Sequence, residues 1–388
     1  FLSLARMPFP ARASHTSRCA LSLPHRPRSR RATALCARAS ANDSETKIAT
    51  LGALALGGTL AVNAGLQAIG LDEDQAHAAV LVALSVASTV AWFQTGGGGD
   101  VSLRVAREEE SVMSEAPTAE LEAMDAAALS SAEGLQSAVE ALERDGVLRL
   151  SGVVGEASAD AALTSVSRSL TATEAEVARG DAVQEERFAP VLARQSRWDV
   201  FQRKEEPAIG ACVGETLDIL GPLFERLCGA EAPLHELSAL VSDPSSPRQP
   251  VHPDTPFQEE APLYTLFVAL QDVDASMGPT VFLPGTHVEA SHDEFNAGEV
   301  SKMRLLGRAP VRLSLLRRGE AALFDSRLLH CGSGNASERR RTLLYLTFAN
   351  PRANLAAVAN GSLLREYRRQ GLTLEKLRAQ RLARAEAR

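Results

Sequence analysis

An imidazole and a carboxylate lie two residues apart in the stretch VHPDTPF, residues 251–257. In an extended backbone the side chains at i and i+2 leave the same face, so His252 and Asp254 could bind one ion. In a helix the same two side chains would diverge by about 200°. The spacing therefore predicts two ligands of a metal site, provided that this segment is extended and that a third ligand comes from elsewhere in the chain.

The third ligand of such a site would be a neutral imidazole on a different strand, and the histidines that could supply it are His235, His287, His292 and His330. His330 follows the apolar pair Leu328-Leu329 and precedes a glycine-rich turn, and Arg341 comes eleven residues after it. Two histidines and one carboxylate on one face of an octahedral ferrous ion leave three positions, enough for a bidentate 2-oxo acid and dioxygen. A guanidinium nearby could bind the far carboxylate of that acid in a two-pronged geometry that lysine cannot reproduce.

The bulk composition narrows the class of protein. The chain has 388 residues, of which 45% are hydrophobic and 23% charged, enough for one large core or two domains. The formal net charge of -7 argues against a nucleic-acid partner. The five cysteines form no CxxC pair, which argues against a disulfide framework or a zinc–thiolate site and favours a reducing compartment.

Residues 1–40 differ from the rest of the chain because they contain eight arginines and no acidic residue. Without that charge of +8 the remainder carries about -15, from -7 minus 8. A segment rich in Arg, Ser and Ala without acids is typical of an organelle transit peptide, and the alternative is a disordered basic tail. We expect a plastid first and a mitochondrion second.

Residues 41–99 are expected to hold apolar helices followed by a glycine linker. Ile48–Leu71 carries no charge, a second apolar segment covers about 76–93, and a glycine run at 96–99 follows. Each segment is about long enough to cross a bilayer, so a membrane hairpin over 48–93 is one interpretation. The alternatives are two helices packed on each other or on the catalytic domain, and import through the A-x-A cleavage pattern at 76–78.

From residue 100 onward the sequence predicts an acidic linker or helix over 100–135, a domain over 136–352 and a basic C-terminal helix over 353–388. Within the domain, apolar periodicity predicts helices and alternation or β-branched runs predict strands. The predicted helices are 137–144, 158–178 and 208–228, and the predicted strands are 147–150, 263–270, 281–283, 311–315, 321–324 and 342–348. Many short strands separated by turns indicate a mainly β sandwich or barrel with flanking helices.

Several motifs together resemble one known family. HPDTPF, then GPTVFLPGTH at 278–287, then HCGSGN with Arg341 eleven residues after His330, are similar to the phytanoyl-CoA dioxygenase family of Fe(II)/2-oxoglutarate oxygenases. ERDGVLRLSGVV at 143–154 also resembles the usual start of that family's domain, and the resemblance covers roughly 136–352. It implies a double-stranded β-helix, a jelly-roll core of two sheets with helices packed outside.

The resemblance also implies a set of site residues. The iron ligands would be His252, Asp254 and His330, and the residues that bind 2-oxoglutarate would be Arg341, Phe267, Thr265 and Gln249. The cofactors would be Fe(II), 2-oxoglutarate and dioxygen. His287 is expected to be structural and His292 exposed.

The predicted activity is hydroxylation of a small-molecule or lipid-like substrate with release of succinate and CO2. Halogenating relatives carry Gly or Ala where this chain has Asp254, which favours hydroxylation. One alternative is a membrane-tethered jelly roll that binds a metal or a partner without turnover. Another is a cupin-type hydrolase or isomerase, which would not need Arg341. The loops at 181–203 and 287–311 are expected to determine the substrate.

Overall fold

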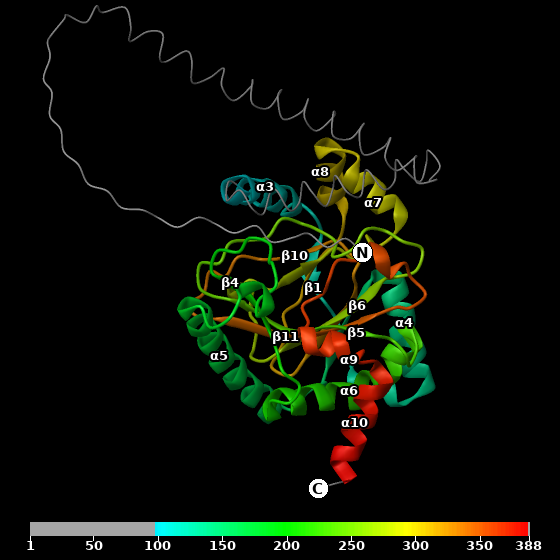
Figure 1. Cartoon of the computed structure of the whole chain (residues 1–388). Coiled ribbons are helices and arrows are strands. Elements are labelled where there is room, and N and C mark those ends of the chain that lie inside the picture. Colours follow the sequence, from blue (N-terminus) through cyan, green and yellow to red (C-terminus); the bar gives the residue numbers. More distant parts are fainter. Residues whose placement is uncertain (1–97, 387–388) are drawn as a thin grey trace, which may run out of the picture. The chain divides into compact units, whose positions relative to one another are not determined.

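The computed structural model describes residues 98–386, drawn in colour in Figure 1. The predicted transit peptide at 1–40 and nearly all of the predicted apolar region at 41–99 lie outside the described residues. Between residues 98 and 386, no helix combines the length and the apolar character needed to cross a bilayer.

Two β-sheets form the centre of the described part, as the jelly-roll prediction requires, and the fold class is confirmed. One sheet has four strands in the order β1-β8-β7-β10, and the other has seven in the order β2-β3-β9-β6-β11-β5-β4. The strands are β1 Thr118–Glu120, β2 Ala123–Asp125, β3 Val147–Ser151, β4 Arg197–Phe201, β5 Leu234–Ser242, β6 Leu263–Ala269, β7 Thr280–Phe282, β8 Val311–Leu313, β9 Ala321–Asp325, β10 His330–Gly332 and β11 Arg341–Ala349. Most neighbouring strands pair antiparallel, and β1 with β8 and β2 with β3 pair parallel.

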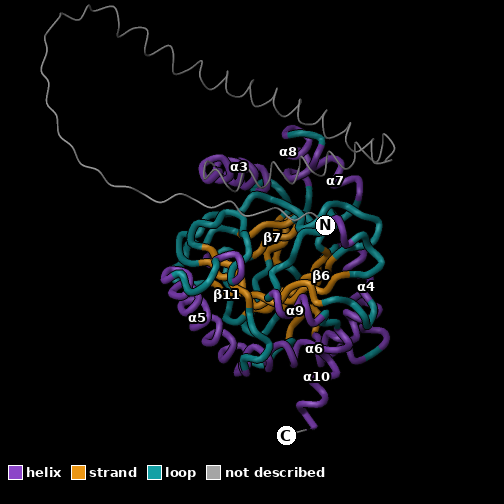
Figure 2. The backbone as a smooth tube through the Cα atoms, viewed as in Figure 1, coloured by secondary structure: helices purple, strands orange, loops and turns teal. Residues whose placement is uncertain are grey.

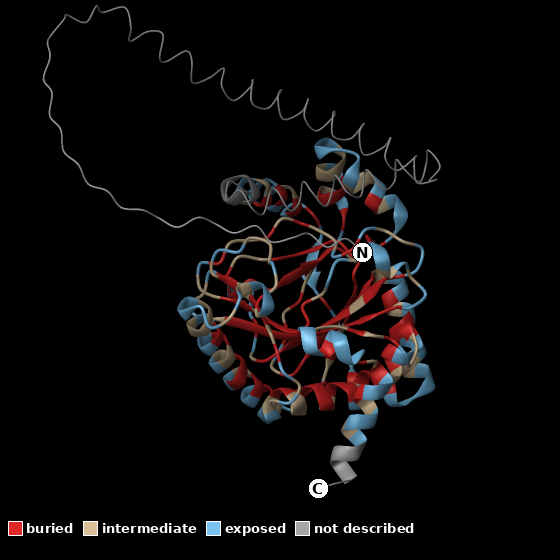
Figure 3. Ribbon diagram, viewed as in Figure 1, coloured by how far each residue is buried: buried red, intermediate tan, exposed pale blue. Residues whose placement is uncertain are grey.

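Helices cover the outer face of the seven-stranded sheet. The helices α4 Ala132–Asp145, α5 Glu156–Arg179 and α6 Pro207–Cys228 share one apolar core with outward side chains of β5, β6, β9 and β11. Figure 2 shows these helices around the strands, and Figure 3 shows that their buried residues face the sheet. This one-sided burial follows from the apolar periodicity of the three helices, and it leaves the opposite face of the sheet for the site.

A second layer of helices lies against the four-stranded sheet. Helix α3 Gly98–Met113 and helix α8 Glu299–Arg308 contribute Met113, Leu305 and Leu306 to a separate apolar core, and α7 Glu289–Asn296 precedes α8. The other members of this core include residues next to the two predicted ligand histidines, namely Val251, Leu329 and Cys331. The backs of the ligand-bearing segments therefore pack against helices.

The helices and strands predicted for the domain are confirmed with shifts of a few residues at their ends. Between helix α4 and strand β3, Gly146 ends the helix at φ 75°, a left-handed conformation that a residue with a side chain rarely adopts. The segment 100–135, predicted as an acidic linker or helix, contains most of helix α3, and it also contains β1 and β2, which were not predicted and which pair with strands of the two sheets. Helix α3 also begins at Gly98, inside the predicted glycine linker.

Three other segments differ from the prediction. The presumed loop 181–203 contains β4, and the presumed loop 287–311 contains α7 and α8. The predicted helix over 353–388 is instead two helices, α9 Arg365–Gln370 and α10 Leu374–Glu386, because Gly371 takes φ 55° between them. Strand β5 is not among the predicted strands.

Candidate active site

His252 and His330 lie opposite each other in an isolated antiparallel bridge. Each backbone N–H donates to the other residue's carbonyl oxygen, with both N···O distances at 2.9 Å. His330 begins β10, whereas His252 lies in a loop and forms only this one bridge, so the extended backbone that the His–Asp spacing requires is local. Pro253 provides the reason, because it has no N–H with which to continue a ladder.

The structure brings the three predicted metal ligands together. Nε2 of His252 lies 3.9 Å from Oδ1 of Asp254, and Nε2 of His330 lies 3.6 Å from the same oxygen. One ligand atom from each residue lies within 4.8 Å of the other two. These separations suit three ligands on one face of a single ion, and the donor set of two imidazoles and one carboxylate fits ferrous iron.

Backbone carbonyl groups fix the orientation of both imidazoles. Nδ1 of His252 lies 2.8 Å from the Pro250 carbonyl oxygen, and Nδ1 of His330 lies 2.9 Å from that of Leu328. A carbonyl only accepts, so both Nδ1 atoms must donate and both Nε2 atoms keep a free lone pair. Burial lowers the pKa of His252 and of His330 to about 4, so both rings are neutral at neutral pH, as metal binding requires.

The carboxylate of Asp254 lies in a buried environment but remains partly accessible to solvent. Burial raises its pKa, and the nearby His252 lowers it. Its side chain still keeps 36% of its surface accessible, more than the 22% of His252 and the 6% of His330. The open side of the cluster therefore lies at Asp254.

Arg341, at the start of β11, is fully buried. Nη2 donates to the Ser242 hydroxyl at 3.0 Å, while Nε and Nη1 have no hydrogen-bond partner among the residues that the structure describes. Within residues 98–386, no carboxylate lies within ion-pair distance of this guanidinium. Burial lowers its pKa to about 9, so it remains charged at neutral pH. Unpaired buried donors are unfavourable, and the carboxylate of a 2-oxo diacid would satisfy them.

Sequence reasoning missed a second buried guanidinium beside Arg341. Arg197 on β4 is 1% exposed, and its Nε donates to the same Ser242 hydroxyl at 3.1 Å. Its remaining donors bind the backbone oxygens of Leu192, Ala193 and Pro247. The sequence feature that could have revealed Arg197 is the alternation of RWDVF, residues 197–201, which is typical of a strand. In the structure this strand places Arg197 on the inner face opposite Ser242.

The other predicted co-substrate residues lie at different distances from Arg341. Gln249 lies close to Arg341, and Gly332 lies between them. A Cβ placed on Gly332 would be 2.6 Å from Oε1 of Gln249 and 3.7 Å from Nη2 of Arg341. The side-chain groups of Gln249 are already bonded, Nε2 to the Leu192 carbonyl and Oε1 to the Gly332 N–H. Thr265 pairs with Thr347 on β11. Thr347 lies six residues along the strand from Arg341, so Thr265 is roughly 20 Å from Arg341.

Phe267 lies between these two ends of the sheet, opposite Tyr345. Its ring packs against Phe324 at 5.1 Å, and Phe324 in turn packs against the His330 ring at 5.0 Å. Phe267 remains partly accessible on the inner face of the sheet. An aromatic wall therefore adjoins the metal cluster.

The inner face of the seven-stranded sheet ends in an acidic network. Asp199 accepts hydrogen bonds from the hydroxyls of Ser238, Tyr345 and Ser362, and Glu236 accepts from the Thr347 hydroxyl at 2.5 Å. Burial raises the pKa of Asp199, and burial together with Asp199 and Asp254 raises the pKa of Glu236 to about 7. The inner face thus changes from basic at Arg341 to acidic at Glu236.

The other candidate histidines in the described part of the chain, His235, His287 and His292, do not join the cluster. His287 is buried and its Nε2 lies 3.1 Å from the Glu143 carbonyl oxygen, in agreement with a structural role. His292 is 3% exposed and its Nε2 lies 2.6 Å from the Arg327 carbonyl oxygen, so the expectation that it is exposed is wrong. It is buried because α7 forms where a loop was expected.

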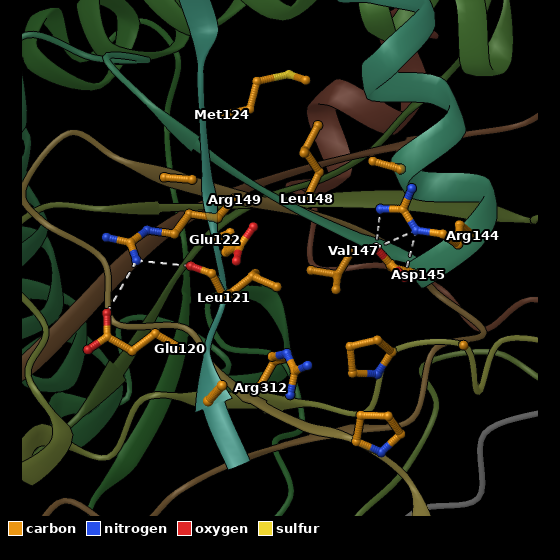
Figure 4. A pocket seen from close by; sticks show the side chains of 16 residues that line it. Glu120, Leu121, Glu122, Met124, Arg144, Asp145, Val147, Leu148, Arg149 and Arg312 are labelled. Atoms are coloured by element: carbon orange, nitrogen blue, oxygen red, sulfur yellow. Dashed lines mark hydrogen bonds and ion pairs between the residues drawn. The ribbon is translucent and has the colours of Figure 1, made fainter. Parts of the chain in front are cut away.

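A separate cavity of about 530 Å³ opens between the β1–β2 segment and the end of α4. Figure 4 shows Arg144, Arg149 and Arg312 among its lining side chains, with Arg144 paired to Asp145. None of the predicted site residues lines it. The cavity is therefore distinct from the His–Asp–His cluster.

The jelly roll, the His–Asp–His cluster and the buried guanidinium define an iron- and 2-oxoglutarate-dependent enzyme. The sequence model described as "Phytanoyl-CoA dioxygenase (PhyH)" matches residues 142–343, just over half of the chain. The chain belongs to the phytanoyl-CoA dioxygenase family, and the predicted cofactors Fe(II) and 2-oxoglutarate agree with this membership.

Comparison with solved structures finds similar chains of low identity. The non-heme α-ketoglutarate-dependent epimerase SnoN from nogalamycin biosynthesis is 17% identical, with 60% of this chain and 96% of that chain covered at a TM-score of 0.43. AviO1 from Streptomyces viridochromogenes Tue57 is 18% identical, with 56% and 96% covered at a TM-score of 0.42. The carbocyclase SnoK is 18% identical, with 61% and 91% covered at 0.41. Comparison with curated proteins finds no match.

Proposed function

We propose that this protein is a dioxygenase that hydroxylates a small-molecule or lipid-like substrate and converts 2-oxoglutarate to succinate and CO2. The observation that carries the proposal is the His252–Asp254–His330 cluster together with the buried guanidinium of Arg341, whose Nε and Nη1 have no partner among the described residues. Iron and 2-oxoglutarate, when bound, supply the oxidising chemistry. The carboxylate of Asp254 occupies the position that halogenating relatives leave free, which supports hydroxylation.

The protein's own residues bind and orient the metal and 2-oxoglutarate and shield the site. His252, Asp254 and His330 would hold the metal, with both imidazoles kept in the required tautomer by carbonyl groups. Arg341 would hold the far carboxylate of 2-oxoglutarate, and Arg197 adds a second positive charge beside that dianion. Gln249 supports this end through the Gly332 N–H, and we assign it a positioning role.

The substrate would bind on the inner face beyond the metal cluster. Phe267 and Leu240 keep accessible surface there and would contact apolar parts of a substrate. Thr265 lies too far along the sheet from Arg341 to share a short diacid with it, so we assign Thr265 to the substrate side. The walls of this region are partly polar, which suits a small molecule with both apolar and hydroxyl-bearing parts.

The test is turnover of 2-oxoglutarate by the full chain with ferrous iron and oxygen. Succinate should form in the presence of a substrate from a metabolite screen, whose product gains one oxygen atom in mass. His330→Ala should abolish both signals because it removes a ligand. Metal binding without succinate release under any condition would favour the alternative of a non-catalytic binding module.

We also propose a plastid location, with a mitochondrion as the second choice, supported by the Arg-rich, acid-free composition of residues 1–40. The apolar segments at 48–93 support a membrane association of the same protein. A fluorescent fusion of residues 1–100 tests both, by its organelle and by its extraction with carbonate or detergent.

A further inference from the structure

The backbone of the loop that carries two of the three metal ligands donates one hydrogen bond to a side chain from outside the loop, and that side chain belongs to α3. Each non-proline backbone N–H over Gln249–Thr255 has an acceptor, and all but one of the acceptors are backbone carbonyl oxygens. These carbonyls belong to Gly332, His330 and Ser326. The exception is Val251, whose N–H donates to Oε2 of Glu109 at 2.7 Å. A side chain of α3 thus completes the hydrogen bonding of the metal loop.

Glu109 is held firmly in this place. It is 0% exposed, and its Oε1 lies 2.5 Å from Nζ of Lys302 on α8. A buried carboxylate is unfavourable unless it is paired and hydrogen-bonded. In Glu109, Oε1 pairs with the Lys302 ammonium and Oε2 accepts the hydrogen bond from Val251. Hydrogen bonds to a charged acceptor are shorter and stronger than neutral ones. The pair therefore fixes α3, α8 and the metal loop relative to one another.

The hydrogen bond acts next to a ligand. Val251 immediately precedes His252, and its side chain lies in the apolar core that also holds Leu329 and Cys331, the neighbours of His330. Along both segments the apolar side chains face the helices while the imidazoles face the metal position. Moving Val251 would therefore turn His252 away from Asp254.

We propose that Glu109 is a positioning residue for the metal site, and that α3 is part of the catalytic unit although it precedes the family match at 142–343. The inference rests on the proposed function, because it concerns the same metal ligands. Loss of the Glu109 carboxylate leaves the three ligands present but lets the Val251–His252 backbone shift. The expected consequence is weaker metal binding.

The experiment measures metal affinity in the full chain without turnover, by titration calorimetry with Mn(II). Glu109→Ala should weaken binding by about 10-fold, the lower end of what outer partners of metal ligands contribute. Glu110→Ala removes the neighbouring exposed carboxylate of α3, which faces Arg248 at 3.8 Å, and should leave affinity unchanged. Leu142→Ala creates a cavity in the core under α4 and serves as the control for general destabilisation, with affinity again unchanged.

A double variant separates the hydrogen bond from the charge. In Glu109→Gln with Lys302→Gln, one amide oxygen can accept from Val251 while its NH2 group donates to the second amide. Affinity should return close to that of the unchanged chain, and affinity as weak as that of Glu109→Ala would overturn the positioning role. Equal binding by the unchanged chain and Glu109→Ala would overturn it as well. If the unchanged chain binds no Mn(II), the proposed metal site itself is wrong.

Discussion

His252 and His330 are bonded to each other through their backbones in both directions, with N···O distances of 2.9 Å. The two imidazoles come from segments 78 residues apart, from 330 minus 252, and these backbone hydrogen bonds join the two segments. Their ring centroids lie 4.7 Å apart. The metal site is therefore largely formed by the fold, and the first prediction concerns the removal of metal.

Chelation of the metal should leave the fold intact. The far-UV circular dichroism of the protein with EDTA should equal that of the metal-loaded protein, because the sheets and both helix layers are formed by protein contacts. The free energy of unfolding should fall only by the binding contribution, about 2.7 kcal/mol when free metal is at 100 times its Kd. Loss of the β signal on chelation would contradict a preformed site.

Replacement of Arg341 should act on 2-oxoglutarate. Arg341→Gln keeps a donor but removes the charge and the two-pronged geometry, so the KM for 2-oxoglutarate should rise about 100-fold, equivalent to roughly 3 kcal/mol. Arg340→Gln is the matched control, because the partly exposed Arg340 already pairs with Asp243 and so has no free donor pair to offer the co-substrate. Its KM should stay within about twofold. A similar rise in both variants would refute the specific role of Arg341.

Gly332 should be sensitive to a single methyl group. A Cβ at this position would lie 2.6 Å from Oε1 of Gln249, closer than real Cβ atoms come. Gly332→Ala should displace Gln249, weaken 2-oxoglutarate binding about 10-fold and cost about 1–3 kcal/mol of stability. The comparison is Gly334→Ala, where the nearest atom would be 3.3 Å away, with a smaller effect on binding. Equal binding losses in the two variants would argue against the role given to Gln249.

Much of the domain could be predicted from sequence because its signals are local. The apolar periodicity of α6 and the β-branched run of β6 are visible without tertiary information, and the order of HPDTPF, His330 and Arg341 predicted the cluster. The alternation of RWDVF indicates a strand with Arg197 on one face, but it does not show that this face lines the site, and Glu109 has no local signal. Arg197 lies in a five-residue strand whose partner β5 carries mixed polar residues, and the role of Glu109 arises from a contact 142 residues away along the chain. Such contacts depend on tertiary packing, which no short pattern records.

Glu236 should make stability depend on pH. Burial, Asp199 and Asp254 raise its pKa from 4.5 to about 7. A folded-state pKa above the unfolded one means that the folded state holds the proton more tightly. The tighter proton binding by Glu236 therefore stabilises the folded protein fully below pH 4.5, and this stabilisation is lost as the pH rises through 7. The loss amounts to about 3 kcal/mol at most, and less to the extent that the partly accessible carboxylate is solvated.

Glu236→Gln cannot titrate, so it should gain stability relative to the unchanged protein as the pH rises. Urea unfolding of the metal-free protein at about pH 5 and pH 8, on either side of the raised pKa, measures the difference. The stability of the variant minus that of the unchanged protein should increase by about 2–3 kcal/mol between the two values. Glu338→Gln, at an exposed carboxylate, should change by less than about 0.5 kcal/mol. If the stability difference between Glu236→Gln and the unchanged protein does not change with pH, the Glu236 carboxylate is solvated in the folded protein. The inner face would then lack the buried acidic group that the hydrogen bonds around Glu236 indicate.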